Sequence, residues 1–262
     1  MLVAVRSGNA KMLAELMEQD PGFTVNVYLD GNGWTFLHHA CGSGNSSAVI
    51  PLLLAHPDID VNAKATSGST PFSVACATGS TSCAREILKD SRAKVNEPDN
   101  DGFTPLWRAA YFGYLDIIRW WIASGREMDL GKPGDVYKTD AIGGAKREGE
   151  TEVVTLLERF KSDAARTRYA MRVELGWYDE AAAEMFALVV FISDELLQIK
   201  DTKITTPAAR FFDIARSLPL ELQMVLCHRL VGSPKEIIPG NDSEVAFKSL
   251  AKRLLWSLFF TN

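Results

Sequence analysis

The sequence predicts an all-α protein with a solenoid of stacked helical hairpins over residues 1–160 and a helical domain over residues 161–262. Two observations support the solenoid. A short motif that opens with threonine returns every 34 or 35 residues, and a glycine follows each motif at a near-constant distance. Because several independent markers keep the same period, we interpret residues 1–160 as about five copies of one structural unit. Beyond residue 161 the repeat stops, and the apolar residues follow helical spacing alone.

Each copy is predicted to begin with a turn and a short first helix. A glycine before the threonine supplies a turn with positive φ, and the threonine caps the helix N-terminus. Proline then occupies the first helical position in two copies, where its missing N–H is not needed. A second glycine ends the helix. The opening motifs are Thr35-Phe36-Leu37-His38, Thr70-Pro71-Phe72-Ser73, Thr104-Pro105-Leu106-Trp107 and Thr139-Asp140-Ala141-Ile142, and the ending glycines are Gly44, Gly79, Gly113 and Gly149.

The second helix of each copy carries an apolar stripe, and a closing pair of residues follows it. One copy cannot bury such a stripe alone, so the copies must stack. A first copy without its opening turn contributes Gly8. The closing pairs are Val25-Asn26, Val61-Asn62, Val95-Asn96 and Met128-Asp129.

These motifs resemble the ankyrin repeat, a unit of about 33 residues with a β-turn finger, two antiparallel helices and a Thr-Pro-Leu-His opening. The resemblance covers residues 1–160 and implies an ankyrin-repeat solenoid. It also implies that His38 hydrogen-bonds the backbone of a neighbouring finger. The sequence departs from the family pattern at Phe36, which replaces proline, and in the fifth copy, where Asp140 replaces proline and one extra residue precedes Gly149. We interpret the fifth copy as a capping copy.

The resemblance further implies a protein partner, bound on a concave face made of finger tips and of the positions before each first-helix glycine. On this face the third copy offers only small residues, whereas the fourth offers aromatic rings, which dominate binding hot spots. We therefore predict an aromatic contact zone centred on the fourth copy, beside a shallow trough at the third. The alternative is that the rings pack against neighbouring fingers or helices, or against the C-terminal domain. The predicted partner-binding residues are Asn32, Trp34, Asp101, Phe103, Tyr111, Phe112 and Lys138.

The C-terminal segment is predicted to form helices at about 163–175, 178–199, 207–217, 219–231 and 243–259. Its last 45 residues resemble an F-box, a helical unit that opens with Leu-Pro-x-Glu. The resemblance implies a substrate adaptor that docks a Skp-type linker of a cullin–RING ubiquitin ligase. The alternative is a plain helix start, with proline at the first position and a carboxylate in the first turn. The predicted docking residues are Leu218, Pro219, Leu222 and Leu226.

Residues for catalysis, metal binding or cofactor binding form no convincing pattern. Cys41 and Cys76 occupy the same position of successive copies, as small buried residues do. Gly143-Gly144 lacks the spacing of a phosphate-binding loop and indicates close helix packing. His56 lies in an inserted turn, where we expect it to be exposed. We predict a non-enzymatic protein without metal or cofactor; the alternative is an enzyme with an unrecognised site in residues 161–262.

Composition limits the classes of partner and the cellular locations that the chain can have. The 262 residues carry 28 Lys+Arg and 33 Asp+Glu, and 47 % of them are hydrophobic, which is too many for a disordered chain. The net charge of −5 disfavours nucleic acid as a partner. We also expect no membrane segment, because charged residues interrupt the most apolar stretch, residues 181–199. Four irregularly spaced cysteines indicate a reducing compartment, so the expected location is the cytoplasm, with the nucleus as an alternative.

Overall fold

The computed structural model describes residues 1–20, 22–44, 47–131, 139–194, 211–212, 214–233, 235, 237–238 and 240–260, apart from the side chains of 241 and 252–260. Within these ranges every regular element is a helix, which confirms the predicted all-α class. The chain divides into two compact units, residues 1–171 and 172–262. The division falls inside helix α11 (Ala164–Glu174), whereas the end of the repeats near residue 160 stays a prediction.

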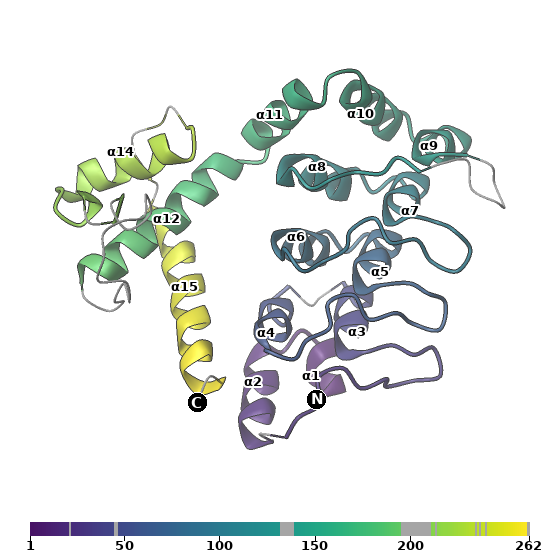
Figure 1. Ribbon diagram of the computed structural model, residues 1–262, viewed down its shortest axis with the longest axis horizontal. Helices are drawn as coiled ribbons and strands as arrows, with labels where there is room; N and C mark the ends of the chain where they lie inside the picture. The colour runs from purple at the N-terminus through teal and green to yellow at the C-terminus, as the bar shows by residue number, and fades with distance from the viewer. Residues whose placement is uncertain are drawn as a thin grey trace. The chain divides into compact units, whose positions relative to one another are not determined.

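The first unit is a stack of helical hairpins (Figure 1). The first helices of successive copies, here called inner helices, pack side by side in one row, and the second, outer helices form a parallel row. Fingers project beyond the inner row on one side. The copies are α1 (Leu2–Arg6) with α2 (Ala10–Gln19), α3 (Phe36–Gly42) with α4 (Ile50–Ala55), α5 (Pro71–Thr78) with α6 (Thr81–Lys89), α7 (Pro105–Tyr111) with α8 (Leu115–Ser124), and α9 (Ala141–Glu148) with α10 (Thr151–Ser162).

Threonine caps three inner helices, as the opening motifs predict. The Oγ1 atoms of Thr70 and Thr104 each accept a hydrogen bond, at 3.2 Å, from the backbone N–H three residues later. Thr35 and His38 form a capping box, in which the side chain of each residue accepts a hydrogen bond from the backbone N–H of the other. Side-chain oxygens in this position satisfy N–H groups that the helix itself leaves without partners, so each cap fixes where its helix begins.

The fifth copy differs from the prediction at its cap. Asp140, and not Thr139, caps α9, and its Oδ1 accepts from the Gly143 N–H at 2.8 Å. The extra residue of this copy therefore lies before the helix and not within it. Thr139 takes another role, because its Oγ1 accepts from Trp107 Nε1 at 3.4 Å across the interface between the fourth and fifth copies.

Glycine permits both the turns and the close approach of the next copy. Gly79 ends α5 with φ of +73°, and a Cβ there would lie 2.6 Å from the ring of Tyr114 in the following copy. Gly68, with φ of +78°, similarly faces Asn100 of the next finger. Side chains at these positions would be strained by backbone conformation and would also collide with the neighbouring copy.

A ladder of asparagine side chains joins the loops that close successive copies. Asn62 Nδ2 donates to the Arg92 carbonyl at 2.9 Å, and Asn62 Oδ1 accepts from the Lys94 N–H at 2.7 Å. Asn26 and Asn96 make the equivalent pairs with the loops that follow them. Each amide thus spans one copy step and holds two loops in register.

The core of the first unit runs between the two helix rows. Phe72 and Trp121 meet edge to face there, with ring centroids 4.9 Å apart. Trp120, by contrast, is only half-buried, and the Arg85 guanidinium lies 4.2 Å from its ring. Gly144 lies beneath the Trp107 indole, which confirms that this glycine serves close packing. The largest fully buried side chains also include Leu37, Ile50, Leu53, Ile87, Leu106, Ile117, Ile118 and Ile122.

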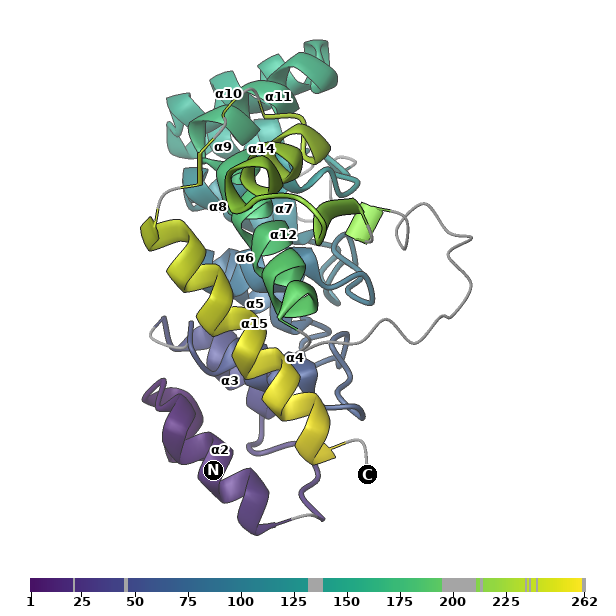
Figure 2. The ribbon, with the colours of Figure 1, turned by 90° about the vertical axis from the view of Figure 1, so that its left-hand side faces the viewer.

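The described part of the second unit includes α12 (Trp177–Ser193), α14 (Leu220–Leu230) and the long α15 (Gly240–Phe260) (Figure 2). Helix α12 packs against both others, with Phe186 of α12 edge to face against Phe247 of α15. His228 Nε2 bonds the Ile237 carbonyl at 3.0 Å and secures the loop after α14. Helix α15 begins three residues earlier than predicted, and residues 195–199, predicted to continue α12, lie outside the described ranges.

We predict that Asn62→Ala lowers the free energy of unfolding by about 1–2 kcal/mol, because two partly exposed hydrogen bonds between copies are lost. Chemical denaturation of the whole chain measures this change. Asn32→Ala is the matched control, since that side chain is exposed on a finger tip and should leave stability within about 0.5 kcal/mol. Equal effects of the two substitutions would contradict a structural role for the ladder.

Candidate functional site

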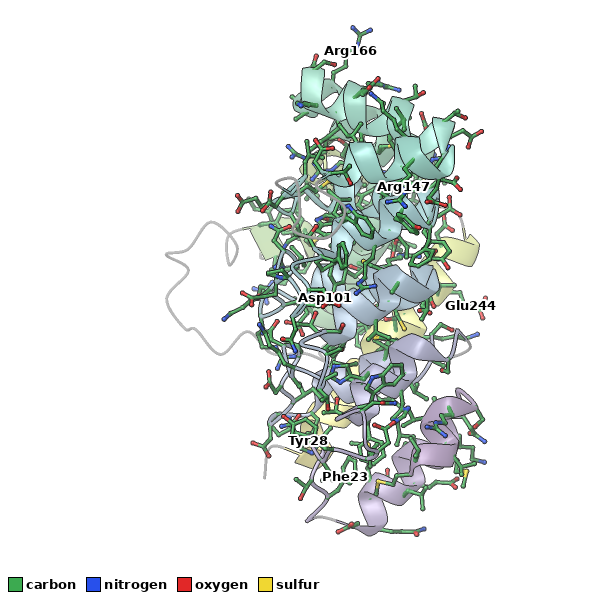
Figure 3. The ribbon with its side chains drawn as sticks, turned by 90° about the vertical axis from the view of Figure 1, so that its right-hand side faces the viewer. Phe23, Tyr28, Asp101, Arg147, Arg166 and Glu244 are labelled. Carbon is green, nitrogen blue, oxygen red and sulfur yellow. The ribbon has the colours of Figure 1, made fainter. Side chains whose placement is uncertain are left out.

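The candidate site is the face of the first unit that the fingers and the inner helices share. Figure 3 shows this face, with Asp101 on a finger and Arg147 near the end of α9. Its residues come from separate copies, so the spacing of the stack fixes their relative positions. No described helix has both the length and the apolarity to cross a bilayer.

In the second copy, Trp34 rests on its own inner helix. Its ring lies 5.1 Å from the His39 ring and 6.2 Å from the His38 ring, measured between centroids. A Cβ at Gly42 would lie 2.8 Å from the indole, so the small residue makes room for it. Trp34 is therefore half-buried, whereas Asn32 is exposed at the finger tip.

His38 joins two copies, as the resemblance implied. Its Nε2 lies 3.1 Å from the Ser69 carbonyl of the next finger, and its Nδ1 lies 3.2 Å from the Thr35 N–H. The tautomer with the proton on Nε2 satisfies both contacts. Burial lowers the pKa of His38, against the opposing effect of the Ser69 hydrogen bond.

His39 forms a cluster with Arg6 and Asp30 beneath Trp34. Arg6 Nη2 donates to His39 Nδ1 at 3.2 Å, and Asp30 Oδ2 lies 3.3 Å from His39 Nε2. Burial, followed by the positive charge of Arg6, lowers the pKa of His39, while Asp30 acts in the opposite direction. The cluster links the first inner helix to the second finger, a role that the sequence left undecided.

The fourth copy repeats this arrangement at the same offsets. Asp99 accepts from the Phe103 N–H at 3.0 Å, as Asp30 does from the Trp34 N–H at 3.1 Å, and Asp99 pairs with Arg108. In both copies an acid thus stands four residues before the finger aromatic and a basic residue five after it. This pattern of an acid, an aromatic and a basic residue was not predicted, although its spacing is visible in the sequence. The third copy lacks it and has Ala65, Ser69 and Val74 in these positions.

Phe103 follows the alternative prediction, in which the ring packs against its neighbours. Only 9 % of this residue is accessible, because its ring packs on Trp107 at 4.3 Å and under the Arg108 guanidinium at 5.3 Å. Tyr111 stacks on the other side of this group, 4.7 Å from the Trp107 ring, and is half-buried. Phe103 thus supports the surface from below.

Phe112 and Tyr114 complete an aromatic ridge, defined here as Trp107, Tyr111, Phe112 and Tyr114. Phe112 is 46 % exposed and meets Tyr111 edge to face at 5.2 Å and Tyr114 at 6.0 Å. Asp101 is exposed on the nearby finger, whereas Lys138 lies outside the described residues.

The third copy presents small side chains beside this ridge. Thr78 is exposed, yet its hydroxyl is already committed to the Val74 and Cys41 carbonyls at 3.0 and 3.1 Å. Ser67 and Ser69 hydrogen-bond each other at 3.1 Å. Their polar groups therefore satisfy neighbouring protein atoms.

The predicted linker-docking residues on the second unit differ in exposure. Leu222 is 51 % exposed and Pro219 is also exposed. Leu218 is half-buried, and Leu226 packs against the core that α12 contributes. Exposed leucines therefore stand at both ends of α14, with Leu222 near its start and Leu230 at its end, and the F-box resemblance stays a prediction.

In the described part of the chain, all four histidines and all four cysteines are buried. There, no three His, Cys, Asp or Glu side chains converge as a metal site requires. Burial raises the pKa of the Cys227 thiol to about 12, which keeps it protonated and weakly nucleophilic. His56 is buried, contrary to expectation, because its ring packs edge to face against Phe23 at 6.1 Å.

The comparisons with known proteins agree with this architecture. A family model of ankyrin repeats matches residues 1–65 and 48–132, together half of the chain. The chain belongs to the ankyrin-repeat family, and its repeats are a protein–protein interaction module.

Curated relatives match parts of the chain only. The SMC5-SMC6 complex localization factor protein 1 of Bos taurus is 30 % identical over 150 residues, which are 55 % of this chain and 14 % of that protein. Alpha-latrotoxin-Lg1a of Latrodectus geometricus is 34 % identical over 111 residues, 42 % of this chain and 8 % of the toxin. Human ankyrin repeat domain-containing protein 49 is 46 % identical over 44 residues, 17 % of this chain and 18 % of that protein. The chain thus spans less than a fifth of each of these relatives.

We predict that stability falls as the pH falls below about 6.5, the ordinary pKa of histidine. Burial lowers the pKa values of His38, His39 and His56 in the folded chain, so the unfolded chain binds more protons in this range. Thermal unfolding at pH 7.5 and 5.5 should show a Tm lower by several degrees at pH 5.5. Replacing His39 with Gln should reduce the difference, and an unchanged difference would exclude His39 as a contributor.

Proposed function

We propose that this chain is a non-enzymatic module that binds a protein partner on the finger and inner-helix face, with Phe112 as the central contact. The carrying observation is the 46 % exposure of Phe112 on a rigid aromatic ridge. An aromatic side chain held by its neighbours loses little conformational entropy when a partner covers it. Tyr111 and Tyr114 flank the contact, Asn32, Trp34 and Asp101 form its more polar surroundings, and Phe103 supports it from beneath.

Two further observations support a binding role over catalysis. The ankyrin family typically serves protein interaction, and the Cys227 thiol in the second unit has the raised pKa of an inert buried group. The name of the bovine relative assigns it the localisation of another protein complex. We propose that this chain likewise recruits a protein partner, in the nucleus or the cytoplasm, through its ankyrin repeats.

We predict that Phe112→Ser reduces partner capture about tenfold or more while the Tm changes by less than about 2 °C, because a hot-spot ring is lost from the surface and not from the core. Quantitative affinity capture from cell extract, followed by mass spectrometry, compares the variant with the wild type. Tyr169→Ser is the matched control, since this ring is exposed on α11, away from the fingers. Unchanged capture by the Phe112 variant would refute the proposed contact.

A second candidate function is that of an F-box-like substrate adaptor, in which the repeats hold a target and α14 docks a Skp-type linker. The exposure of Leu222 and Pro219 in the first turn of α14 favours it.

We expect Leu222→Asp to abolish co-purification of a Skp-type linker with the whole chain, if α14 docks it. Leu230→Asp, at the other end of α14 and equally exposed at 52 %, is the control and should retain the linker. Both substitutions lie on the surface, so both proteins should keep the wild-type Tm. Absence of the linker from wild-type preparations at micromolar concentrations would exclude the adaptor role.

A further inference from the structure

The carboxylate of Glu150 lies over Gly113, the residue between Phe112 and Tyr114 of the aromatic ridge. Glu150 precedes α10, and its carboxylate occupies the space over Gly113 where a Cβ would otherwise project. Gly113 separates Phe112 from Tyr114 in the chain, and the centroids of these two rings are 6.0 Å apart. The interface between the fourth and fifth copies thus places one carboxylate beside the backbone that carries the two aromatic rings.

Within the described part of the chain, Glu150 has neither an ion pair nor a side-chain hydrogen bond, although it is half-buried. The nearby cations face other carboxylates. Arg147 Nε lies 3.9 Å from Glu148, and Lys146 Nζ lies 2.7 Å from Glu158. A partly desolvated carboxylate without a cation favours the arrival of a positive charge.

We propose that Phe112, Tyr114 and Glu150 form a site for an arginine or lysine side chain of the protein partner. This inference rests on the proposed function and specifies the chemistry of its central contact. A cation placed against the rings gains cation–π attraction, and the carboxylate pairs with its charge. Arginine fits best, because its planar guanidinium stacks on a ring and presents a fork of donors to a carboxylate.

The same geometry rejects other side chains. An apolar residue would cover Phe112 and Tyr114 but would bury the Glu150 charge without compensation. An acidic residue would add repulsion between like charges. The carboxylate therefore gives the preference for a basic side chain, and the rings add affinity for any side chain that covers them. Substituting each group separates the two contributions.

Binding of the whole chain to an array of twelve-residue peptides tests this proposal. The peptides carry varied flanks around a fixed central residue, which is arginine, lysine, norleucine or glutamate. We expect the arginine and lysine sets to bind about fivefold better than the norleucine set at 0.1 M salt, and this preference to weaken at 0.5 M salt.

Glu150→Gln should abolish the preference and leave the Tm unchanged, because the side chain takes no part in capping α10. Glu152→Gln, an exposed carboxylate on the same helix, is the matched control and should preserve it.

The outcomes separate this inference from the proposed function. Phe112→Ser should weaken binding of all four peptide sets, whereas Glu150→Gln should affect only the two basic sets. Binding that depends on Phe112 but shows no preference for a basic residue would overturn the inference and leave the proposed function standing. A preference that survives Glu150→Gln would also overturn it. If no peptide binds above background, the inference fails, and the capture experiment with Phe112→Ser decides the proposed function by itself.

Discussion

The hydrogen bonds that cross from one copy to the next are the constraint on which the first unit depends. A single hairpin buries too little apolar surface to be stable, so its position must be set by its neighbours. Asn26, Asn62 and Asn96 set it at the closing loops, and the Ser69 carbonyl, bonded to His38, sets it at the fingers. Because the asparagine contacts repeat over the first four copies, the surface they support is preorganised before any partner arrives.

The sequence predicted the all-α stack because its period is carried by residues with strict local roles. A capping threonine, a proline at the first helical position and a glycine with positive φ each depend on nearby backbone alone. The prediction that threonine caps each inner helix was wrong at Thr139, because Asp140 caps α9 instead. Both residues can cap, and only the packing of Trp107 against Thr139 distinguishes them.

The candidate surface was predictable only in part, because exposure depends on contacts between copies. Phe103 and Phe112 looked alike in the sequence, yet Phe103 is covered by Trp107 and Arg108, whereas Phe112 projects outward. His56 was misjudged for the same reason, since Phe23 of the first copy shields it. Glu150 escaped notice because its importance comes from lying over Gly113, 37 positions earlier in the chain.

The asparagine ladder ends at the fourth copy, where Asp129 takes the asparagine position. The Asp129 N–H still donates to Asn96 Oδ1, at 3.1 Å, but the Asp129 carboxylate has no N–H to donate to a following loop, and its Oδ1 accepts from the Gly131 N–H in its own loop. The ladder therefore has a direction. In three copies the side chain bonds the loop of the following copy, whereas in the fourth copy it bonds only its own loop. The last joint of the stack therefore depends on the packing of α7 against α9 and on the bond from Trp107 to Thr139, without the side-chain amide that the earlier joints have.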